Sequence, residues 1–449
     1  MTNATEYVRL IQEKLHQQDN GQEEFLQAID EFMPSATKFL EKHPEYINRN
    51  ILGILTEPER IIQFRVPWQD DEGNWQVNRG YRIQYNSAIG PYKGGLRFHS
   101  SVNLSILKFL AFEQIFKNSL TGLPIGGGKG GSDFDPKGKS DDEIMRFCQS
   151  FMLELSKHIG PSIDVPAGDI GVGAREIGYL FGEYKRLKQY DAGVLTGKPL
   201  DFWGSKIRTE ATGYGLVYYV KHLLHAENES FANKTVFVSG SGNVAIYAIE
   251  KVHELGGKVV TCSDSSGYIY DPEGIDLSLL KEIKEEKRQR LTEYAKVRQS
   301  AVYHADASVW TLKEKGEIAL PCATQNEITE NLARNLVENG IMIVAEGANM
   351  PCTFDAVSVF EQADVWYCPG KAANAGGVAV SAIEMSQNSQ RLSWESEKVD
   401  QQLDEIMQTI YQTCRKTAAE YGNEKNLLLG ANVAGFEKVA KVMYAQGLV

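Results

Sequence analysis

The stretch KTVFVSGSGNVAIYAIEKVHELGGKVVTCSDSSG, residues 234–267, decides the fold. An apolar run leads into small residues, an amphipathic stretch follows, and a second apolar run ends at Asp264. This order predicts a strand, a glycine turn, a helix and a second strand. Further short apolar runs alternate with helix-like stretches, which is typical of a parallel, doubly wound α/β sheet. These later runs lie within 316–324, 341–349 and 363–370.

The glycine turn of this stretch, GSGNVA at 240–245, fits the pattern G-x-G-x-x-A. Gly240 makes the turn, and Gly242 lets the backbone approach a pyrophosphate, which the N–H groups at the helix start would bind. Asp264 ends the next predicted strand at the spacing expected for a group that contacts a ribose. The context therefore predicts a dinucleotide site, and a glycine-rich turn without a ligand is the alternative. The predicted coenzyme contacts are Gly240, Ser241, Gly242, Asn243, Val244, Asp264 and Ser265.

The choice between the two nicotinamide coenzymes depends on the surroundings of Asp264. An acidic residue here usually binds the ribose 2′-hydroxyl of NAD. Several serines nevertheless crowd the place that a 2′-phosphate would occupy, and basic residues on the predicted charged helix 277–299 could reach it. For each basic residue alone, a solvated helix face is the simpler interpretation. The residues concerned are Ser241, Ser263, Ser265, Ser266, Lys284, Arg288 and Arg290.

Length and composition limit the class of protein. A chain of 449 residues predicts two domains. The net charge of −12 disfavours a nucleic-acid partner. No apolar run approaches the ~18 residues of a membrane span, and the polar N-terminus has no signal core. Six scattered cysteines without C-x-x-C indicate reduced thiols in a cytoplasmic protein, and eight scattered histidines give no metal-ligand spacing.

The first half of the chain has a different pattern from the second half. The irregular stretch TGKPLDFWGS at 196–205 places the domain boundary near residue 200. Before this boundary the pattern predicts two helices within 1–45, strands at 60–69 and 75–90, an apolar helix at 102–120, a glycine loop at 126–131, and a helix at 141–159 that a capping box of Ser140 and Glu143 begins. After the sheet of the second half, residues 374–446 are predicted to be helical.

The glycine loop lies in LPIGGGKGGSDFDP, 123–136, and surrounds one lysine, Lys129. A phosphate-binding P-loop is excluded, because Leu123 stands where its first glycine is needed and Gly130 where Ser or Thr is needed. The glycines instead give Lys129 a tight surrounding that a small substrate can enter. Burial beside other cations would lower the pKa of Lys129 and prepare it for proton chemistry.

Four more polar residues are candidates for a substrate site. Lys93 lies in GPYKGGLRFH and Asp169 in PAGDIGVG, both among small residues. Gln114 and Lys117 are three residues apart and share one helix face. Asp169 is suited to be a general acid or base. Any one of the lysines may be read as an exposed, solvated side chain, but glycine-framed polar residues recur three times.

Together these motifs resemble the hexameric bacterial glutamate dehydrogenases of the Glu/Leu/Phe/Val dehydrogenase family. The resemblance covers nearly the whole chain, in order. The motifs that carry it are KGGLRFH (93–99), LPIGGGKGGSDFDP (123–136), VPAGDIGVG (165–173), VSGSGNVA (238–245), PCATQNEI (321–328), EGANMP (346–351) and NAGGVAVSAIEMSQN (374–388).

The resemblance implies an N-terminal α/β substrate and oligomerisation domain, residues 1–200, and a Rossmann-like coenzyme domain, residues 201–424. The last helix, about 425–449, returns to the first domain, and the chains form a homo-hexamer. By the same resemblance Lys129 is the catalytic lysine and Asp169 moves protons at the amino nitrogen. The other implied site residues are Gln114 and Lys117 for the α-carboxylate, Lys93 and Ser381 for the side-chain carboxylate, and Arg208, Thr212, Asn243, Gln325, Asn349 and Asn374 along the cleft or at the coenzyme.

The implied reaction is the reversible reductive amination of 2-oxoglutarate with ammonia and NADPH to L-glutamate. GSGNVA followed by SDSSG resembles the NADP-using members, while GYIYDPEGI (267–275) resembles a NAD-specific branch. NADP(H) is therefore favoured and NAD(H) is possible. One alternative is a related dehydrogenase of apolar amino acids, although such relatives have apolar residues where Lys93 and Ser381 stand. A more distant alternative is a catalytically silent dinucleotide-binding regulatory protein.

Overall fold

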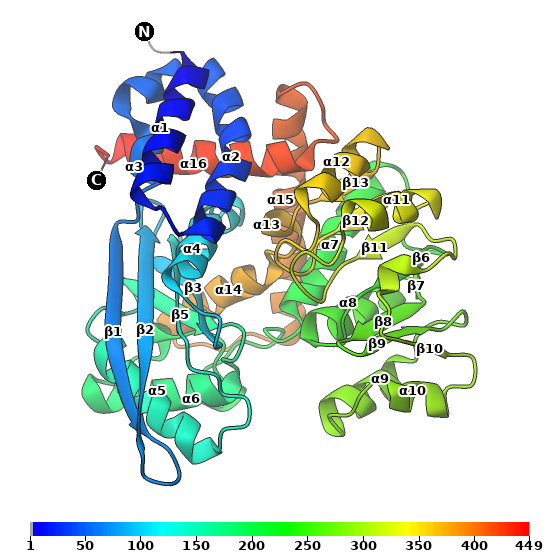
Figure 1. Ribbon diagram of the computed structural model, residues 1–449, viewed down its shortest axis with the longest axis horizontal. Helices are drawn as coiled ribbons and strands as arrows, with labels where there is room; N and C mark the ends of the chain where they lie inside the picture. The colour runs from blue at the N-terminus through cyan, green and yellow to red at the C-terminus, as the bar shows by residue number, and fades with distance from the viewer. Residues whose placement is uncertain (1–2, 449) are drawn as a thin grey trace. The chain divides into compact units, whose positions relative to one another are not determined.

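The structure, a computed structural model, describes residues 3–448 (Figure 1). The chain folds into two compact units. Unit 1 contains the chain up to Arg208, together with Val380–Val399 and the segment from Asn432 onward. Unit 2 contains Thr209–Ala379 and Asp400–Ala431. Each unit has its own β-sheet and its own hydrophobic core.

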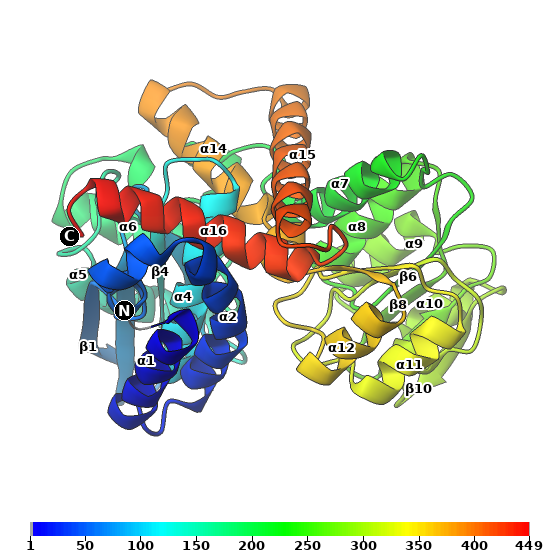
Figure 2. The ribbon, with the colours of Figure 1, turned by 90° about the horizontal axis from the view of Figure 1, so that it is seen from above.

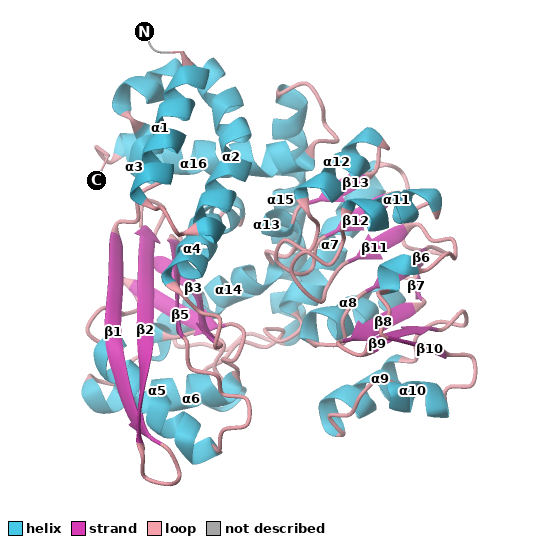
Figure 3. Ribbon diagram, viewed as in Figure 1, coloured by secondary structure: helices cyan, strands magenta, loops and turns pink. Residues whose placement is uncertain are grey.

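Unit 1 is built on a five-stranded mixed sheet with the order β1-β2-β4-β3-β5 (Figure 3). The long strands β1 and β2 form an antiparallel hairpin around the turn at 70–74, and β2 is also antiparallel to β4. The strands β4, β3 and β5 run parallel to one another. The strands are β1 (Arg60–Gln69), β2 (Trp75–Asn86), β3 (Tyr92–Phe98), β4 (Gly127–Ser132) and β5 (Asp164–Gly168).

The prediction of a glycine loop at 126–131 is wrong. Most of this stretch forms β4, the central strand of the sheet. Glycine is depleted in strands, so the composition favoured a loop. Packing explains the exception. A Cβ atom at Gly127 would lie 2.6 Å from the side chain of Ile115, and one at Gly130 would lie 2.7 Å from the carbonyl oxygen of Tyr81. The glycines let this strand lie unusually close to its neighbours.

Helices cover both faces of the sheet of unit 1. Helix α4 packs on one face, and α5 and α6 pack on the other, where Phe98, Phe147 and Phe151 form an aromatic core. The predicted capping box is confirmed: Glu143 N donates to Ser140 Oγ at 3.1 Å, and Ser140 N donates to Glu143 Oε2 at 3.0 Å. The helices are α1 (Ala4–Gln18), α2 (Glu23–Lys42), α3 (Ile51–Leu55), α4 (Leu104–Leu120), α5 (Asp141–Leu155) and α6 (Ala174–Leu187).

Two helices from the end of the chain complete unit 1. Helix α14 (Gly376–Gln390) enters the unit at Val380, and α16 (Leu427–Ala445) belongs to it from Asn432. Helix α16 passes beside α2 (Figure 2). Phe436 of α16 makes an edge-on contact with Phe32 of α2 at 5.5 Å between ring centroids. Asn432 also donates from Nδ2 to Ser35 Oγ of α2 at 3.1 Å. The C-terminal helix is therefore part of the core of the N-terminal segment.

Unit 2 contains a parallel five-stranded sheet with the order β13-β12-β11-β6-β7. Helices α7 and α8 lie on one face of this sheet and α11 and α12 on the other (Figure 2). The strand order reverses beside β6, which creates the switch point where such sheets bind ligands. The prediction of a Rossmann-like, doubly wound domain is confirmed. The elements are β6 (Thr235–Val238), β7 (Lys258–Val259), β11 (Ile318–Leu320), β12 (Ile343–Ala345), β13 (Trp366–Cys368), α7 (Ala211–Ala226), α8 (Asn243–Glu254), α11 (Glu330–Glu338), α12 (Phe354–Gln362), α13 (Gly370–Ala373) and α15 (Ser396–Glu420).

Two details of unit 2 differ from the predictions. The apolar run after α8 is divided, because β8 (Thr261–Asp264) leaves the parallel sheet and pairs antiparallel with β9 (Gly267–Tyr270), which pairs with β10 (Val302–Ala305). The charged segment 277–299 is not one helix. It consists of α9 (Leu277–Lys281), a π-helical turn at Glu282–Glu286 and α10 (Thr292–Val297). The helical conformation is interrupted before α10, where Arg288 has a φ of +52° and the Leu291 N–H donates to Asp264.

Two features are absent from residues 3–448. None of the helices between residues 3 and 448 combines the length and the apolar character that a membrane crossing needs. Over the same residues, no group of three or more His, Cys, Asp or Glu side chains is placed to hold a metal ion.

Candidate active site

Lys129 and Asp169 meet in unit 1. Lys129 projects from β4 with 4% of its surface exposed, and its Nζ lies 3.3 Å from Asp169 Oδ1. Asp169 follows β5, which pairs with β3, and Arg97 of β3 donates from Nε to Asp169 Oδ2 at 2.8 Å. The two carboxylate oxygens therefore face one cation each. Arg97 lies within KGGLRFH, but the sequence does not identify it as a site residue, because its partner lies 72 residues away in the chain.

The pKa values of this group follow from burial and from the neighbouring charges. Burial lowers the pKa of Lys129, and Arg97 and Arg82 lower it further, while Asp169 opposes the change. Burial disfavours ionisation of Asp169, but Lys129 and Arg97 outweigh it and hold its pKa at about 2. The site thus combines a firmly ionised carboxylate with an ammonium group that gives up its proton more easily than an exposed lysine does.

Lys93 and Arg208 form a second cationic group in unit 1. Lys93 of β3 is 1% exposed and donates from Nζ to Thr196 Oγ1 at 2.8 Å. Arg208 donates from Nε to Ser381 Oγ of α14 at 3.0 Å. Burial and the positive charge of Arg208 hold the pKa of Lys93 well below its usual range. Within residues 3–448, no carboxylate forms an ion pair with either cation. This arrangement is suited to receive a carboxylate from a ligand.

Gln114 and Lys117 lie on α4, which packs against β4. Gln114 donates from Nε2 to Asn118 Oδ1 at 2.7 Å, and Asn118 donates from Nδ2 to the carbonyl oxygen of Lys93 at 3.1 Å. Gln114 is therefore tied to the strand that carries Lys93. The predicted substrate residues of unit 1 come from elements that are neighbours in the fold.

A buried ion pair between Arg82 and Asp164 supports these strands. Both side chains are fully buried, and Arg82 Nε donates to Asp164 Oδ2 at 2.8 Å. Arg82 also donates from Nη1 to the carbonyl oxygen of Gly94 at 3.1 Å, and Gln84 donates to Asp164 at 3.0 Å. These bonds hold β2, β3 and β5 together beside Lys93. The sequence contains no local signal for this pair, whose members are 82 residues apart.

In unit 2 the turn after β6 has the form expected of a pyrophosphate site. Gly240 has a φ of +86°, and its N–H donates to Ser263 Oγ at 2.7 Å. Gly242 is the residue before the first turn of α8 and has a φ of −89°, which any residue can adopt. A Cβ at Gly242 would meet nothing within 4 Å. Neither backbone strain nor packing requires glycine there, so the open space at the helix N-terminus fits a bound phosphate group.

The carboxylate oxygens of Asp264 accept hydrogen bonds from other groups of the protein. Its Oδ1 accepts from Ser266 N at 2.9 Å and from Ser266 Oγ at 2.6 Å, and its Oδ2 accepts from Leu291 N at 3.0 Å. Lys284 Nζ lies 3.9 Å from Oδ2. Nearby, Arg290 donates from Nη1 to Ser265 Oγ at 2.6 Å. Asp264 therefore organises a loop that carries hydroxyl and cationic groups, and this chemistry fits a 2′-phosphate better than a free 2′-hydroxyl.

Asn374 has a buried acceptor that lacks a partner. Its Nδ2 donates to the carbonyl oxygens of Gly347 at 3.2 Å and Ala348 at 3.0 Å, while its buried Oδ1 has no hydrogen-bond partner within the described chain. This acceptor is available to an N–H donor, for example the amide group of a ligand. The other predicted coenzyme residues of unit 2 are more exposed: Thr212 lies in the first turn of α7, and Gln325 and Asn349 lie in loops after strands.

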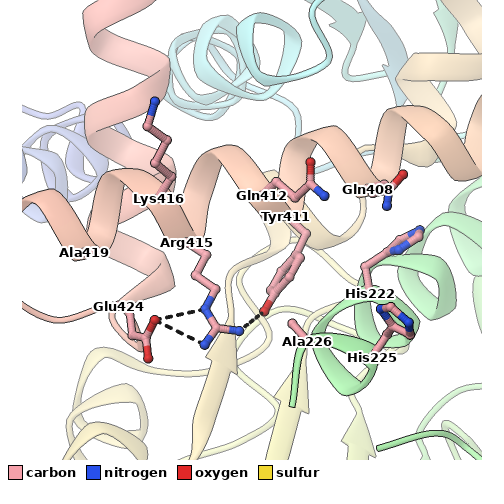
Figure 4. A pocket seen from close by; sticks show the side chains of 10 residues that line it. All are labelled: His222, His225, Ala226, Gln408, Tyr411, Gln412, Arg415, Lys416, Ala419 and Glu424. Atoms are coloured by element: carbon pink, nitrogen blue, oxygen red, sulfur yellow. Dashed lines mark hydrogen bonds and ion pairs between the residues drawn. The ribbon is translucent and has the colours of Figure 1, made fainter. Parts of the chain in front are cut away.

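A separate pocket of unit 2 contains none of the predicted site residues. It has a volume of about 360 Å³ and lies between α7 and α15 (Figure 4). Arg415 is the central cation of its wall, but Glu424 and Tyr411 already engage it, at 3.1 Å and 2.9 Å. The predicted residues therefore lie outside this pocket.

Comparisons with known proteins agree with the resemblance. The family model "Glu/Leu/Phe/Val dehydrogenase, dimerisation domain" matches residues 58–186, and the model "Glutamate/Leucine/Phenylalanine/Valine dehydrogenase" matches residues 204–447. The NAD(P)-specific glutamate dehydrogenase of Xylanibacter ruminicola is 58% identical over 99% of both chains. The NADP-specific glutamate dehydrogenases of Haemophilus influenzae and Escherichia coli are 57% and 55% identical, each over 97% of both chains.

Solved structures give the same result. The crystal structure of Plasmodium falciparum glutamate dehydrogenase superposes with a TM-score of 0.97 at 52% identity, over 99% of this chain and 95% of that chain. The hetero-hexameric glutamate dehydrogenase of Thermus thermophilus superposes with a TM-score of 0.80 at 25% identity, over 92% of this chain and 97% of that chain. The resemblance found in the sequence is confirmed, and the chain belongs to the Glutamate/Leucine/Phenylalanine/Valine dehydrogenase family.

Proposed function

We propose that the protein is a glutamate dehydrogenase that catalyses the reversible reductive amination of 2-oxoglutarate with ammonia and NADPH to L-glutamate. The observation that carries this proposal is the pair formed by the buried Lys93 and the half-buried Arg208, with which no carboxylate of the described chain forms an ion pair. A substrate with a second, distal carboxylate would supply the missing negative charge. The names of the similar proteins agree with this substrate.

The proposed binding mode uses two groups of residues in unit 1. Lys93, Arg208 and Ser381 bind the distal carboxylate, because the charge of Arg208 acts on Lys93 and each cation is bonded to a hydroxyl group and to no carboxylate. Gln114 and Lys117 on α4 bind the α-carboxylate. The 2-oxo carbon then lies toward Lys129 and Asp169. Two anchor points orient the substrate, and a fixed orientation accounts for a large part of an enzyme's rate enhancement.

The proposed mechanism divides the proton chemistry between Lys129 and Asp169. Lys129 donates a hydrogen bond to the 2-oxo oxygen and stabilises the negative charge that develops there when ammonia attacks the carbon. Asp169 accepts a proton from the attacking nitrogen and passes it to the oxygen, Lys129 donates the second proton that this oxygen needs, and the oxygen leaves as water. Arg97 holds the Asp169 carboxylate in place. NADPH, when bound, supplies the hydride that reduces the resulting carbon–nitrogen double bond.

The coenzyme is assigned as NADP(H), on the fit of unit 2 to this ligand. Gly240, Ser241, Gly242, Asn243 and Val244 form the pyrophosphate turn, and Asn374 offers its unpaired Oδ1 to the carboxamide. Thr212, Gln325 and Asn349 are the remaining proposed contacts. Ser265, with Arg290 and Lys284, is assigned to the 2′-phosphate, while Asp264 positions this loop. The name of the Xylanibacter ruminicola relative, which covers both coenzymes, keeps NAD(H) as the second candidate.

One set of initial-rate assays tests substrate and coenzyme together. The purified protein is given ammonium and either 2-oxoglutarate or the apolar 4-methyl-2-oxopentanoate, each with NADPH and with NADH, and loss of the reduced nicotinamide is followed by absorbance. We expect the highest kcat/KM with 2-oxoglutarate and NADPH. A preference for the apolar acid would indicate a dehydrogenase of another amino acid. No ammonia-dependent oxidation with any pair would indicate a non-catalytic protein.

The proposal includes a cytoplasmic homo-hexamer. A dimerisation domain is part of the matched family, and the structurally similar Thermus thermophilus protein is described as a hetero-hexamer. All six cysteines are free and buried, which suits a reducing compartment. Light scattering coupled to size exclusion should give six times the 50.0 kDa mass of the chain. A mass of one or two chains at micromolar concentration would contradict the hexamer.

A further inference from the structure

A fully buried ion pair joins the loop after η2 (Ala192–Val194) to helix α14 in unit 1. Lys198 Nζ lies 2.6 Å from Glu384 Oε1, and both side chains are completely buried. Lys198 also donates to Asn388 Oδ1 at 2.8 Å and to the carbonyl oxygen of Leu195. Removing two charges from water is costly, so a pair of this kind is weak evidence of stabilisation and points instead to a requirement for position.

Glu384 also binds the backbone of the same loop. Its Oε2 accepts from Gly197 N at 2.9 Å, and its Oε1 accepts from Lys198 N at 3.4 Å. Gly197 has a φ of +81°, so the loop turns sharply there. The residue before Gly197 is Thr196, whose hydroxyl accepts from Lys93 Nζ. The carboxylate of Glu384 thereby fixes the place of the hydrogen-bond partner of Lys93.

The same carboxylate is rigidly linked to the partner of Arg208. Ser381 lies three residues before Glu384 on α14, so the two side chains share one face of the helix. Ser381 accepts from Arg208 Nε at 3.0 Å. Glu384 therefore sets the spacing between the two hydroxyl–cation pairs, Lys93 with Thr196 and Arg208 with Ser381, although it forms no hydrogen bond or ion pair with Lys93 or Arg208.

Glu384 acts on the two cations at longer range as well. Its negative charge raises the pKa of Lys93 and of Arg208 against the lowering effect of burial. The donors that the Glu384 carboxylate accepts from are the backbone of the loop and Lys198 Nζ. Glu384 can thus support the positive charge of Lys93 and Arg208 without occupying the place of a ligand carboxylate.

We infer that Glu384, through its buried pair with Lys198, is the positioning residue that makes the protein select a 2-oxo acid with a distal carboxylate. This inference rests on the proposed function. The selectivity for a distal carboxylate then depends on the distance between the pair Lys93–Thr196 and the pair Arg208–Ser381, and not only on the presence of these residues.

The test is the substrate selectivity of Glu384→Gln, which keeps the size of the side chain. In this variant the amide can place only one oxygen acceptor in the site, and an N–H donor then faces either Lys198 Nζ or the Gly197 amide. Rates are measured with NADPH and ammonium for 2-oxoglutarate and for 2-oxohexanoate, which has a similar length but no distal carboxylate. Misplacement by about 1 Å can lower catalysis about 100-fold, so we expect kcat/KM for 2-oxoglutarate to fall by about that factor, with a raised KM. The kcat/KM for 2-oxohexanoate should change less than about threefold.

The pH dependence of KM separates position from charge. The negative charge of Glu384 raises the pKa of Lys93, so its loss would by itself raise KM only toward high pH, where Lys93 gives up its proton more readily. Displaced donors raise KM at every pH. An increase of KM confined to high pH, no increase, or an equal loss with both acids overturns the inference. If wild-type protein turns over neither acid, the proposed function fails instead, and the two failures are thus distinguished.

Two further variants guard against a simple folding defect. Asn388→Ala removes one acceptor of Lys198 while the pair of Lys198 with Glu384 remains. It should change the ratio of the two kcat/KM values in the same direction as Glu384→Gln but by a smaller factor, about fivefold. An unchanged ratio overturns the inference. Lys108→Met removes another ion pair of unit 1, which Lys108 forms with Asp19 at 2.6 Å. This pair includes neither Lys93, Arg208 nor their hydroxyl partners. This control should lower the thermal midpoint and leave the ratio of the two kcat/KM values unchanged. A changed ratio in the control would attribute the effect to general loosening and also overturn the inference.

Discussion

Two glycine-rich segments carry the proposed chemistry, and glycine has a different purpose in each. In the sheet of unit 1, a Cβ at Gly94 would overlap the carbonyl oxygen of Gly128, and one at Gly131 would overlap that of Arg97. These glycines are required because backbones touch. In the turn of unit 2, a Cβ at Gly242 would meet no atom within 4 Å. That glycine leaves a space, which is the space assigned to the coenzyme.

The difference separates two ways of building a site. In unit 1 Lys129 projects from a strand and Asp169 directly follows one, and the spacing of these strands depends on close backbone contact, so the geometry of the two side chains is set by the fold. In unit 2 the contacts come from loops and a helix start, where the protein contributes open space and N–H groups. Substitutions in unit 1 should therefore affect stability or chemistry, whereas those in the turn of unit 2 should affect mainly coenzyme affinity.

The largest effect is expected for Lys129→Met. Methionine fills a similar volume, and Asp169 keeps its bond to Arg97, so the fold should persist. Loss of the donor that stabilises developing charge should lower kcat about 1000-fold, equivalent to about 4 kcal/mol. The measurement is kcat for 2-oxoglutarate, together with NADPH affinity by fluorescence titration, which should be unchanged because the coenzyme residues lie in unit 2. A variant with wild-type kcat would rule out the proposed role of Lys129.

The next largest effect is expected for Gly94→Ala. The added Cβ meets the backbone of β4 and has no flexible neighbour that can move away. Overpacking of this kind should lower the free energy of unfolding by about 3 kcal/mol. Urea denaturation followed by circular dichroism measures it. The matched control is Gly182→Ala in α6, where a Cβ meets nothing within 4 Å and alanine should stabilise the helix by about 1 kcal/mol. Equal stability of the two variants would show that the glycines of unit 1 are not required by packing.

The same comparison explains what could be predicted from the sequence. The turn at 240–245 was recognisable because strand, turn and helix follow one another within one short stretch. The framing of Lys129 by glycines was also visible, but its strand was not, because the reason lies in neighbours such as Ile115 and Tyr81. Partners far apart in the chain, such as Thr196 for Lys93, 103 residues away, have no local signal. Long-range packing therefore determines the part of the site that the sequence did not reveal.

A smaller effect, which depends on pH, is expected for Arg97→Met. Lys129 and Arg97 hold the pKa of Asp169 at about 2, below its ordinary value of 3.8. A carboxylate with a lowered folded-state pKa contributes stability above its unfolded-state pKa, and this contribution is lost as the pH falls toward 2. Without Arg97 the pKa of Asp169 should rise by about 1 unit, a loss of about 1.4 kcal/mol at neutral pH.

The measurement for Arg97→Met is the thermal midpoint of variant and wild type between neutral and acidic pH. The difference between them should be constant at neutral pH and should shrink as the pH falls through the range between about 4 and 2. A difference that stays constant down to the lowest pH at which both proteins fold would mean that Arg97 contributes by packing and not by its charge.

The smallest effect is expected for Gly242→Ala, which tests the other side of the comparison. The backbone at this position suits alanine, and the methyl group points into open space, so the free energy of unfolding should change by less than about 0.5 kcal/mol. The methyl group should nevertheless hold the pyrophosphate away from the helix start and raise KM for NADPH about tenfold, which is about 1.4 kcal/mol. Gly240→Ala is the contrasting variant, because its φ of +86° strains alanine and its Cβ would lie 3.1 Å from Cys322 O. It should lose stability as well as affinity. Gly242→Ala could instead be destabilised as much as Gly240→Ala, or bind NADPH as tightly as wild type. Either result would mean that the open space at the N-terminus of α8 is not the pyrophosphate site, and the contrast between the two glycine-rich segments would be lost.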